Sequence, residues 1–212
     1  MSSIALGYLE NSHPMPAGLC LTAASGIFIV SAQSTVVQEG RARLSALQSC
    51  YDAGLDVLPL ALRHAVSVDL AQDNILLNYH NIRAGLQRIM GFGQLSLSLR
   101  KSETALATDS NGRSWLAARL RHAATKEADR FRLRQVAIST GYDVCDIVET
   151  RQSFMVGLRV PRNEYLHAVE RLRTELANFG TPEFNSSRFT ISGLWPALGF
   201  ANLWLNQPVQ QL

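Results

Sequence analysis

The 212-residue sequence predicts an α+β fold built from two small domains. Segments with strand-like and helix-like patterns alternate in both halves of the chain, so each half has helices able to cover a sheet. A glycine-flanked junction and a polar stretch, residues 91–112, separate the halves. We therefore predict domains at residues 1–91 and 92–212. The first is expected to be ferredoxin-like, with a split βαβ arrangement, and the second to be α+β with amphipathic helices.

Short apolar runs predict the strands of the first half. Residues 4–9 are mostly apolar, and residues 26–30 (GIFIV) form a β-branched and aromatic run too short for a helix. Residues 55–62 (LDVLPLAL) are a third candidate. Pro59 cannot donate to a sheet ladder, so this strand is expected to lie at an edge or to end there.

Two helices are predicted between and after these strands. Thr35 and Gln38 have the spacing of a capping box, which predicts a helix start there and an end at Gly54. The second helix is predicted over residues 69–90. Its apolar residues step by four, three, four and three positions, which places them on one face. They are Ile75, Tyr79, Ile82, Leu86 and Ile89.

The second half repeats the alternation of strands and helices. Strict polar–apolar alternation predicts a half-buried strand at residues 94–100. A helix is expected from about Arg113 to Phe131, followed by mixed segments. Further strands are expected at residues 154–160 and 188–194, with an amphipathic helix between them that ends at Gly180.

The composition excludes several classes of protein. The chain is 47% hydrophobic and 17% charged, whereas disorder needs low hydrophobicity and high net charge. Residues 17–37 contain too many polar side chains for a membrane span. The first basic residue is Arg41, so the basic start of a signal peptide is missing. We expect a soluble, cytoplasmic protein with no membrane association.

The sequence lacks the common motifs of catalysis and cofactor binding. The glycines at 91 and 93 lack the third glycine and the strand–turn–helix context of a dinucleotide site. The sequence has no phosphate-binding loop, HExxH or GxSxG motif, and no CxxC pair among its three cysteines. No two histidines stand three or four residues apart, as a helical metal pair requires. We therefore predict no enzymatic activity, no cofactor and no metal site.

The strongest charge feature is the predicted helix at residues 113–134. It holds seven basic residues against two acidic ones. Arg119, Lys126 and Arg130 can line one face and are our candidates for contact with an acidic partner. A merely solvated helix would look the same, and a nucleic-acid footprint would too. Few aromatic residues are interleaved, which weakens the case for stacking on single strands.

Aromatic residues gather near the C-terminus, in Trp195, Phe200 and Trp204. Such a cluster either closes the core or forms a docking surface. Trp195, Pro196 and Phe200 are therefore our candidates for an apolar contact. Burial of Trp195 would instead assign it to the core.

The same segment carries a family resemblance. Residues 193–200 (GLWPALGF) resemble the GPWPPYSF signature of the gas vesicle accessory F/L family, with matches at Gly193, Trp195, Pro196 and Phe200. Residues 57–59 (VLP) resemble the start of the family's VLPxRFG strand, although Ala61, Leu62 and Arg63 depart from it. The order of elements is similar from about residue 4 to residue 204, as in a divergent member.

The resemblance implies a non-enzymatic protein with two α+β domains, which acts in the assembly of gas vesicles. Its implied partners are the small hydrophobic shell protein and other vesicle proteins. Two alternatives remain open. One is a nucleic-acid or regulatory binding module that uses the basic helix at residues 113–134, although we expect no nucleic acid as partner. The other is an enzyme whose site is assembled from scattered residues.

Overall fold

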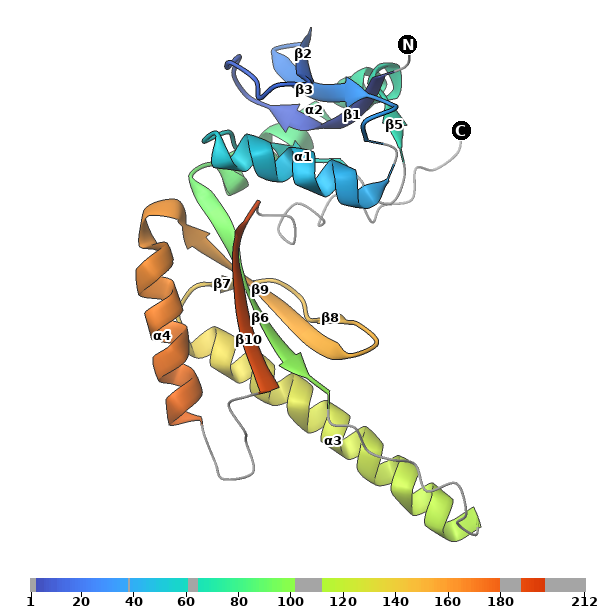
Figure 1. The fold of residues 1–212 in the computed structure, drawn as a ribbon, viewed down its shortest axis with the longest axis vertical. Helices are drawn as coiled ribbons and strands as arrows, with labels where there is room; N and C mark the ends of the chain where they lie inside the picture. The colour runs from blue at the N-terminus through green and yellow to red at the C-terminus, as the bar shows by residue number, and fades with distance from the viewer. Residues whose placement is uncertain (1–2, 38, 61–64, 102–111, 180–187, 197–212) are drawn as a thin grey trace. The chain divides into compact units, whose positions relative to one another are not determined.

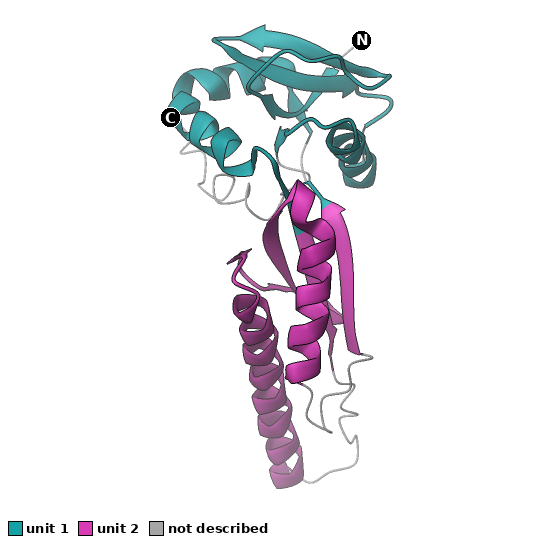
Figure 2. Ribbon diagram, turned by 90° about the vertical axis from the view of Figure 1, so that its left-hand side faces the viewer, with its two compact units in different colours: residues 1–94, 195–212 teal, residues 95–194 magenta. Residues whose placement is uncertain are grey.

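The computed structural model describes residues 3–37, 39–60, 65–101, 112–179 and 188–196. The chain divides into two units, residues 1–94 with 195–212, and residues 95–194 (Figure 2). Within the described residues, the fold is α+β, with two antiparallel sheets and four α-helices (Figure 1). The predicted fold class is confirmed at this level.

The first unit contains a five-stranded sheet in the order β2-β3-β1-β4, with β5 also paired to β1. The strands are β1 (Ser3–Leu9), β2 (Leu19–Ala24), β3 (Ile27–Gln33), β4 (Leu58–Pro59) and β5 (Val66–Ser67). The ferredoxin-like arrangement expected here is not confirmed by this order. Pro59 lies at the sheet edge, as its missing donor predicts. Of the predicted strand over residues 55–62, only β4 forms, and residues 61–62 lie outside the described residues.

The strand β2 was not anticipated from the sequence. Its pairing with β3 runs from Leu19 opposite Ala32 to Ala24 opposite Ile27, which leaves a two-residue hairpin loop. Both loop residues, Ser25 and Gly26, have positive φ angles of 50° and 78°. Such a loop has the twist that the flanking strands require. The alternation of Leu19, Leu21 and the following small residues is too weak to identify the strand by itself.

The central strand β1 is buried on both of its faces. Ile4 and Leu6 belong to an apolar cluster with Val30, Ala32 and the α1 residue Leu47. A register shift between Ala5 and Gly7 marks a β-bulge in the pairing with β3. Beyond this bulge, the Tyr8 hydroxyl donates to the Ala71 carbonyl at 3.2 Å and accepts from Asn74 at 2.9 Å. These bonds attach β1 to α2 (Val68–Ile89).

The first helix, α1 (Gly40–Asp52), begins four residues later than predicted. Its N-cap is Glu39, and that side chain makes no capping bond. The predicted capping box at Thr35 is therefore wrong, because residues 34–36 form a turn in which the Val36 amide donates to Gln33. The helix α2 agrees closely with its prediction. Ser67 caps it by accepting from the Leu70 amide at 3.2 Å, and Asn78 interrupts its helical geometry.

The second unit is built around a sheet in the order β10-β6-β9-β7, with β8 also paired to β9. Two helices, α3 (Gly112–Ser139) and α4 (Tyr165–Asn178), complete it. Each helix connects two strands that have another strand inserted between them, which is a split connection. The strands are β6 (Phe92–Arg100), β7 (Asp143–Val144), β8 (Val148–Glu149), β9 (Ser153–Pro161) and β10 (Phe189–Trp195).

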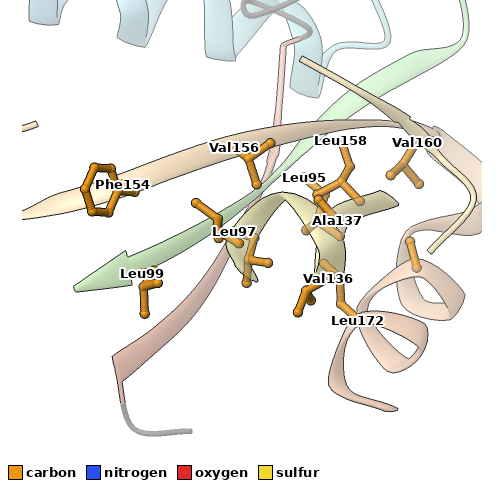
Figure 3. Close-up of a cluster of buried hydrophobic side chains, with 12 residues drawn as sticks. Leu95, Leu97, Leu99, Val136, Ala137, Phe154, Val156, Leu158, Val160 and Leu172 are labelled. Atoms are coloured by element: carbon orange, nitrogen blue, oxygen red, sulfur yellow. The ribbon is translucent and has the colours of Figure 1, made fainter. Parts of the chain in front are cut away.

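Leucines and valines from alternate positions of β6 and β9 form the core of this unit (Figure 3). The helices close it with Leu133, Val136, Ala137, Ala168 and Leu172. The alternation predicted for residues 94–100 is confirmed, since Leu95, Leu97 and Leu99 are all fully buried. The helix α3 extends eight residues beyond its predicted end at Phe131. No glycine or proline interrupts it before Gly141, which has a φ of 75°.

Candidate interaction surfaces

The C-terminal aromatic segment is only partly described. Trp195, the last residue of β10, is 38% exposed, whereas Pro196 directly after it is buried. Phe200 and Trp204 lie outside the described residues. A hydrogen bond of 3.0 Å from the Tyr165 hydroxyl to the Gly193 carbonyl ties β10 to the start of α4. The exposed indole is thus presented at the end of an anchored strand.

The three basic candidates on α3 have different surroundings. Arg119 is exposed and stacks over the ring of Trp115, with 4.7 Å between the guanidinium carbon and the ring centroid. Arg130 forms an ion pair with Glu127 at 3.3 Å, one turn away on the same helix. Exposed pairs of this kind contribute little to stability, typically below about 1 kcal/mol. Both guanidinium groups remain at the surface, where an acidic partner can reach them.

Lys126 is engaged within the protein. Its ammonium lies 2.9 Å from the Glu149 carboxylate on β8, and the ammonium of Lys101 lies 2.7 Å from the same oxygen. Hydrogen bonds from Lys101 and then Lys126 lower the pKa of Glu149 to about 2. Lys101 also donates to the Thr150 carbonyl at 2.6 Å and stands over the ring of Phe154. The two lysines of the chain therefore meet at one carboxylate.

A small hollow of about 80 Å³ adjoins these lysines. A second hollow, in the other unit, measures about 140 Å³. Both are smaller than a ligand pocket, which typically encloses roughly 300–1,000 Å³. Across the described ranges, no three His, Cys, Asp or Glu side chains are grouped closely enough to hold a metal ion. None of the helices described is both long and apolar enough to cross a bilayer.

A second ion pair lies deeper in the same unit. The Arg188 guanidinium donates to the Asp129 carboxylate at 2.6 Å and to the Arg100 carbonyl at 2.7 Å. Asp129 is one of the few buried polar side chains, with 3% of its side chain exposed. A buried carboxylate requires a partner of this kind, because unpaired burial of a charge is costly. The contact joins α3 and the end of β6 to the residue directly before β10.

The sequence did not reveal the ion-pair partners of Glu149 and Asp129. Nothing in the sequence marks Glu149 as the partner of the two lysines, and Asp129 enters the sequence analysis only as one of the two acidic residues of the predicted helix. The α3 residues Lys126 and Asp129 pair with Glu149 on β8 and with Arg188 directly before β10, which are distant along the chain, so helical spacing carries no trace of these pairs. One signal was available: the helical wheel places Asp129 beside Leu133 and Val136 on the apolar face of α3.

These features define the class as a two-unit α+β protein. Its described residues offer exposed side chains for contacts with other proteins, and its ion pairs connect elements of the fold. No protein-family model matches the sequence, and no curated protein matches it in sequence.

Two crystal structures match nearly the whole chain. The gas vesicle protein GvpF from Anabaena sp. PCC7120 has a TM-score of 0.67 at 14% identity, covering 94% of this chain and 95% of that one. GvpF from Microcystis aeruginosa has a TM-score of 0.64 at 12% identity, covering 94% of this chain and 98% of that one. The chain thus has a GvpF-like fold, and the resemblance inferred from the sequence is confirmed at that level.

Proposed function

We propose that this protein is a non-enzymatic accessory protein in gas vesicle assembly, which binds the hydrophobic shell protein and other vesicle proteins. One observation carries the proposal: the match to GvpF spans both units and nearly the full length of both chains. A shared pair of units is more specific than one shared domain. Residues 193–200 (GLWPALGF) add support from the sequence, because they match the family signature at four positions.

The proposed action is protein binding in the cytoplasm, in association with gas vesicles. A hydrophobic shell subunit exposes apolar surface until it is assembled, and such a surface requires a covering partner to stay in solution. Trp195 suits an apolar contact because its indole is 38% exposed at the end of β10. Pro196 is buried and is therefore proposed to hold this chain end rather than to contact a partner.

Since one fold can host many functions, the proposal needs a direct binding test. The tagged full chain would be used to capture the small gas vesicle shell protein and other gas vesicle proteins, in low and high salt, with plasmid DNA as competitor. Capture of the shell protein that persists in high salt is expected. Absence of capture, together with DNA retention that falls steeply with salt, would refute the proposal and favour the nucleic-acid alternative.

The contact residue can be tested in the same assay with matched tryptophan variants. Trp195→Ala is expected to weaken capture of the shell protein, whereas Trp115→Ala is the control because Trp115 is similarly exposed, on α3. Loss of capture in Trp115→Ala alone would move the contact to α3. Unchanged capture in both variants would exclude the two exposed indoles from the contact.

A further inference from the structure

The outer face of α3 carries an exposed stripe of four apolar side chains, among which the charged residues Glu127 and Arg134 also lie. The stripe consists of Leu116, Leu120, Phe131 and Ile138, each at least half exposed, with Leu120 and Phe131 both at 64%. These residues follow each other at steps of four, eleven and seven positions. Each step is close to a whole number of turns of 3.6 residues, so all four lie on one face.

This face points away from the core. The buried residue Leu133 stands two positions after Phe131, and the buried residue Val136 stands two positions before Ile138. Two positions rotate a helix by about 200°. In addition, the first half of α3 runs beyond the sheet (Figure 1), and no described residue before Asp129 in this helix is buried. The helix is therefore apolar on two opposite sides, of which the sheet covers one.

Arginines border the stripe on both sides. Residues 119–121 read Arg-Leu-Arg and residues 130–132 read Arg-Phe-Arg, so the exposed apolar side chain is bracketed twice, at an interval of eleven residues. Neighbouring positions lie about 100° apart, which places one arginine on each flank. Of the two acidic residues of the helix, Glu127 offsets the charge of one of these arginines and Asp129 offsets none of them. Glu127 pairs with Arg130, and Asp129 is buried against Arg188.

We propose that the outer face of α3 is a docking surface for an amphipathic helix of a partner protein whose apolar stripe is bordered by Asp and Glu. Charge complementarity selects this occupant, since arginine forms bidentate pairs with carboxylates. A second copy of α3 would bring arginine borders against each other, which disfavours self-pairing. The surface differs from the one expected from the sequence, because Lys126 lies off the stripe and is held by Glu149. This inference does not depend on the gas vesicle proposal.

The test uses the full chain and a fluorescein-labelled 21-residue helical peptide with leucines at helical spacing, bordered by glutamates. A matched peptide has lysine in place of every glutamate. We expect the glutamate peptide to bind, measured by anisotropy, and the lysine peptide not to bind. Phe131→Glu should weaken binding at least about tenfold. Leu166→Glu, which alters an exposed leucine on α4, should leave binding unchanged.

A charge-reversed variant separates recognition from misfolding. Arg119→Glu combined with Arg121→Glu should lose the glutamate peptide and gain the lysine peptide. Three results would overturn the proposal: equal binding of both peptides, unaltered binding by Phe131→Glu, or preferential binding of duplex DNA to this face. A dimer of the wild-type chain in sedimentation that Phe131→Glu converts to a monomer would assign the face to a second copy instead.

Discussion

Glu149 shows how one side chain organises a surface at the residue scale. Its carboxylate accepts from Lys101, directly after β6, and from Lys126 on α3, so it connects the short strand β8 to two other parts of the unit. Two ammonium groups around one carboxylate favour its ionised form, which is the physical cause of its low pKa.

The depressed pKa of Glu149 predicts an acid-dependent contribution to stability. The folded protein holds this carboxyl ionised down to about pH 2, whereas the unfolded chain takes up the proton near its usual pKa of about 4.3. The stability gap between wild type and Glu149→Gln should therefore be constant above about pH 5. It should shrink as the pH falls towards 2. Urea unfolding of both proteins at several pH values measures the gap, and a gap unaffected by acid would contradict the prediction.

The ion pair between Asp129 and Arg188 should respond unequally to removal of its two partners. Arg188→Met leaves a buried carboxylate unpaired, which is expected to cost about 3 kcal/mol of unfolding free energy. Asp129→Asn should cost less, because Arg188 is 21% exposed and keeps its bonds to the Arg100 carbonyl. Denaturant unfolding measures both losses. Equal or reversed losses would show that the carboxylate is solvated after all.

At the scale of elements, the close approach of β1 to β4 depends on a missing side chain. Gly7 pairs with Pro59, and a Cβ at Gly7 would lie 2.5 Å from the Leu58 carbonyl oxygen and 2.5 Å from a Val57 methyl. The carbonyl is backbone, so it cannot rotate away. This contact fixes the two-residue strand β4 against the sheet.

Gly7→Ala is therefore expected to destabilise the first unit by about 1–3 kcal/mol, the usual cost of overpacking. Gly112→Ala is the matched control, since nothing lies within 4 Å of a Cβ there and alanine favours the helix. Thermal unfolding followed by circular dichroism compares the two variants. A Gly7→Ala protein as stable as wild type would mean that β4 moves without cost.

The elements also show where sequence patterns suffice and where they fail. The helix α2 and the strands β6 and β9 have strong periodicity over seven or more residues, and each forms close to its predicted bounds. The strand β2 has a weak apolar pattern. It is held by its pairing with β3, which the sequence of β2 alone does not indicate. The α1 start was misplaced because Thr35 sits in a turn that competes with the helix.

The candidate surfaces were likewise predicted only in part. The exposure of Trp195 agrees with its predicted role, while that role remains untested. The basic face of α3 was recognised by its charge, yet the tie between Lys126 and Glu149 joins residues 23 positions apart in different elements. The apolar stripe on α3 was also missed, because a helix with two apolar sides has no single dominant face in its sequence.

At the scale of the whole molecule, each unit has its own sheet and its own apolar cluster. All strands of the sheet in the second unit lie between residues 92 and 195, and its buried cluster draws only on that range. The sheet of the first unit lies within residues 3–67. A separate core and a complete sheet are the requirements for independent folding.

A fragment of residues 92–196 is therefore expected to fold alone, with cooperative unfolding and resistance to protease. The dispersion of its amide NMR signals and its urea transition provide the measurement. A fragment of residues 112–196, which lacks the central strand β6, is the matched control and should remain unfolded. If the longer fragment does not fold, the predicted boundary at residues 91–92 does not separate two independently folding domains.

The convergence of both lysines on Glu149 has a consequence for attaching reporters to this protein. Amine-reactive dyes, cross-linkers and biotin esters have two side chains to modify, Lys101 and Lys126, and acylation of either one neutralises a charge that holds β8 in place. Conjugates at either lysine would alter the surface that they are meant to report on. Thiol chemistry is the better route, because Cys20 is exposed, while burial raises the pKa of the Cys50 thiol to about 11.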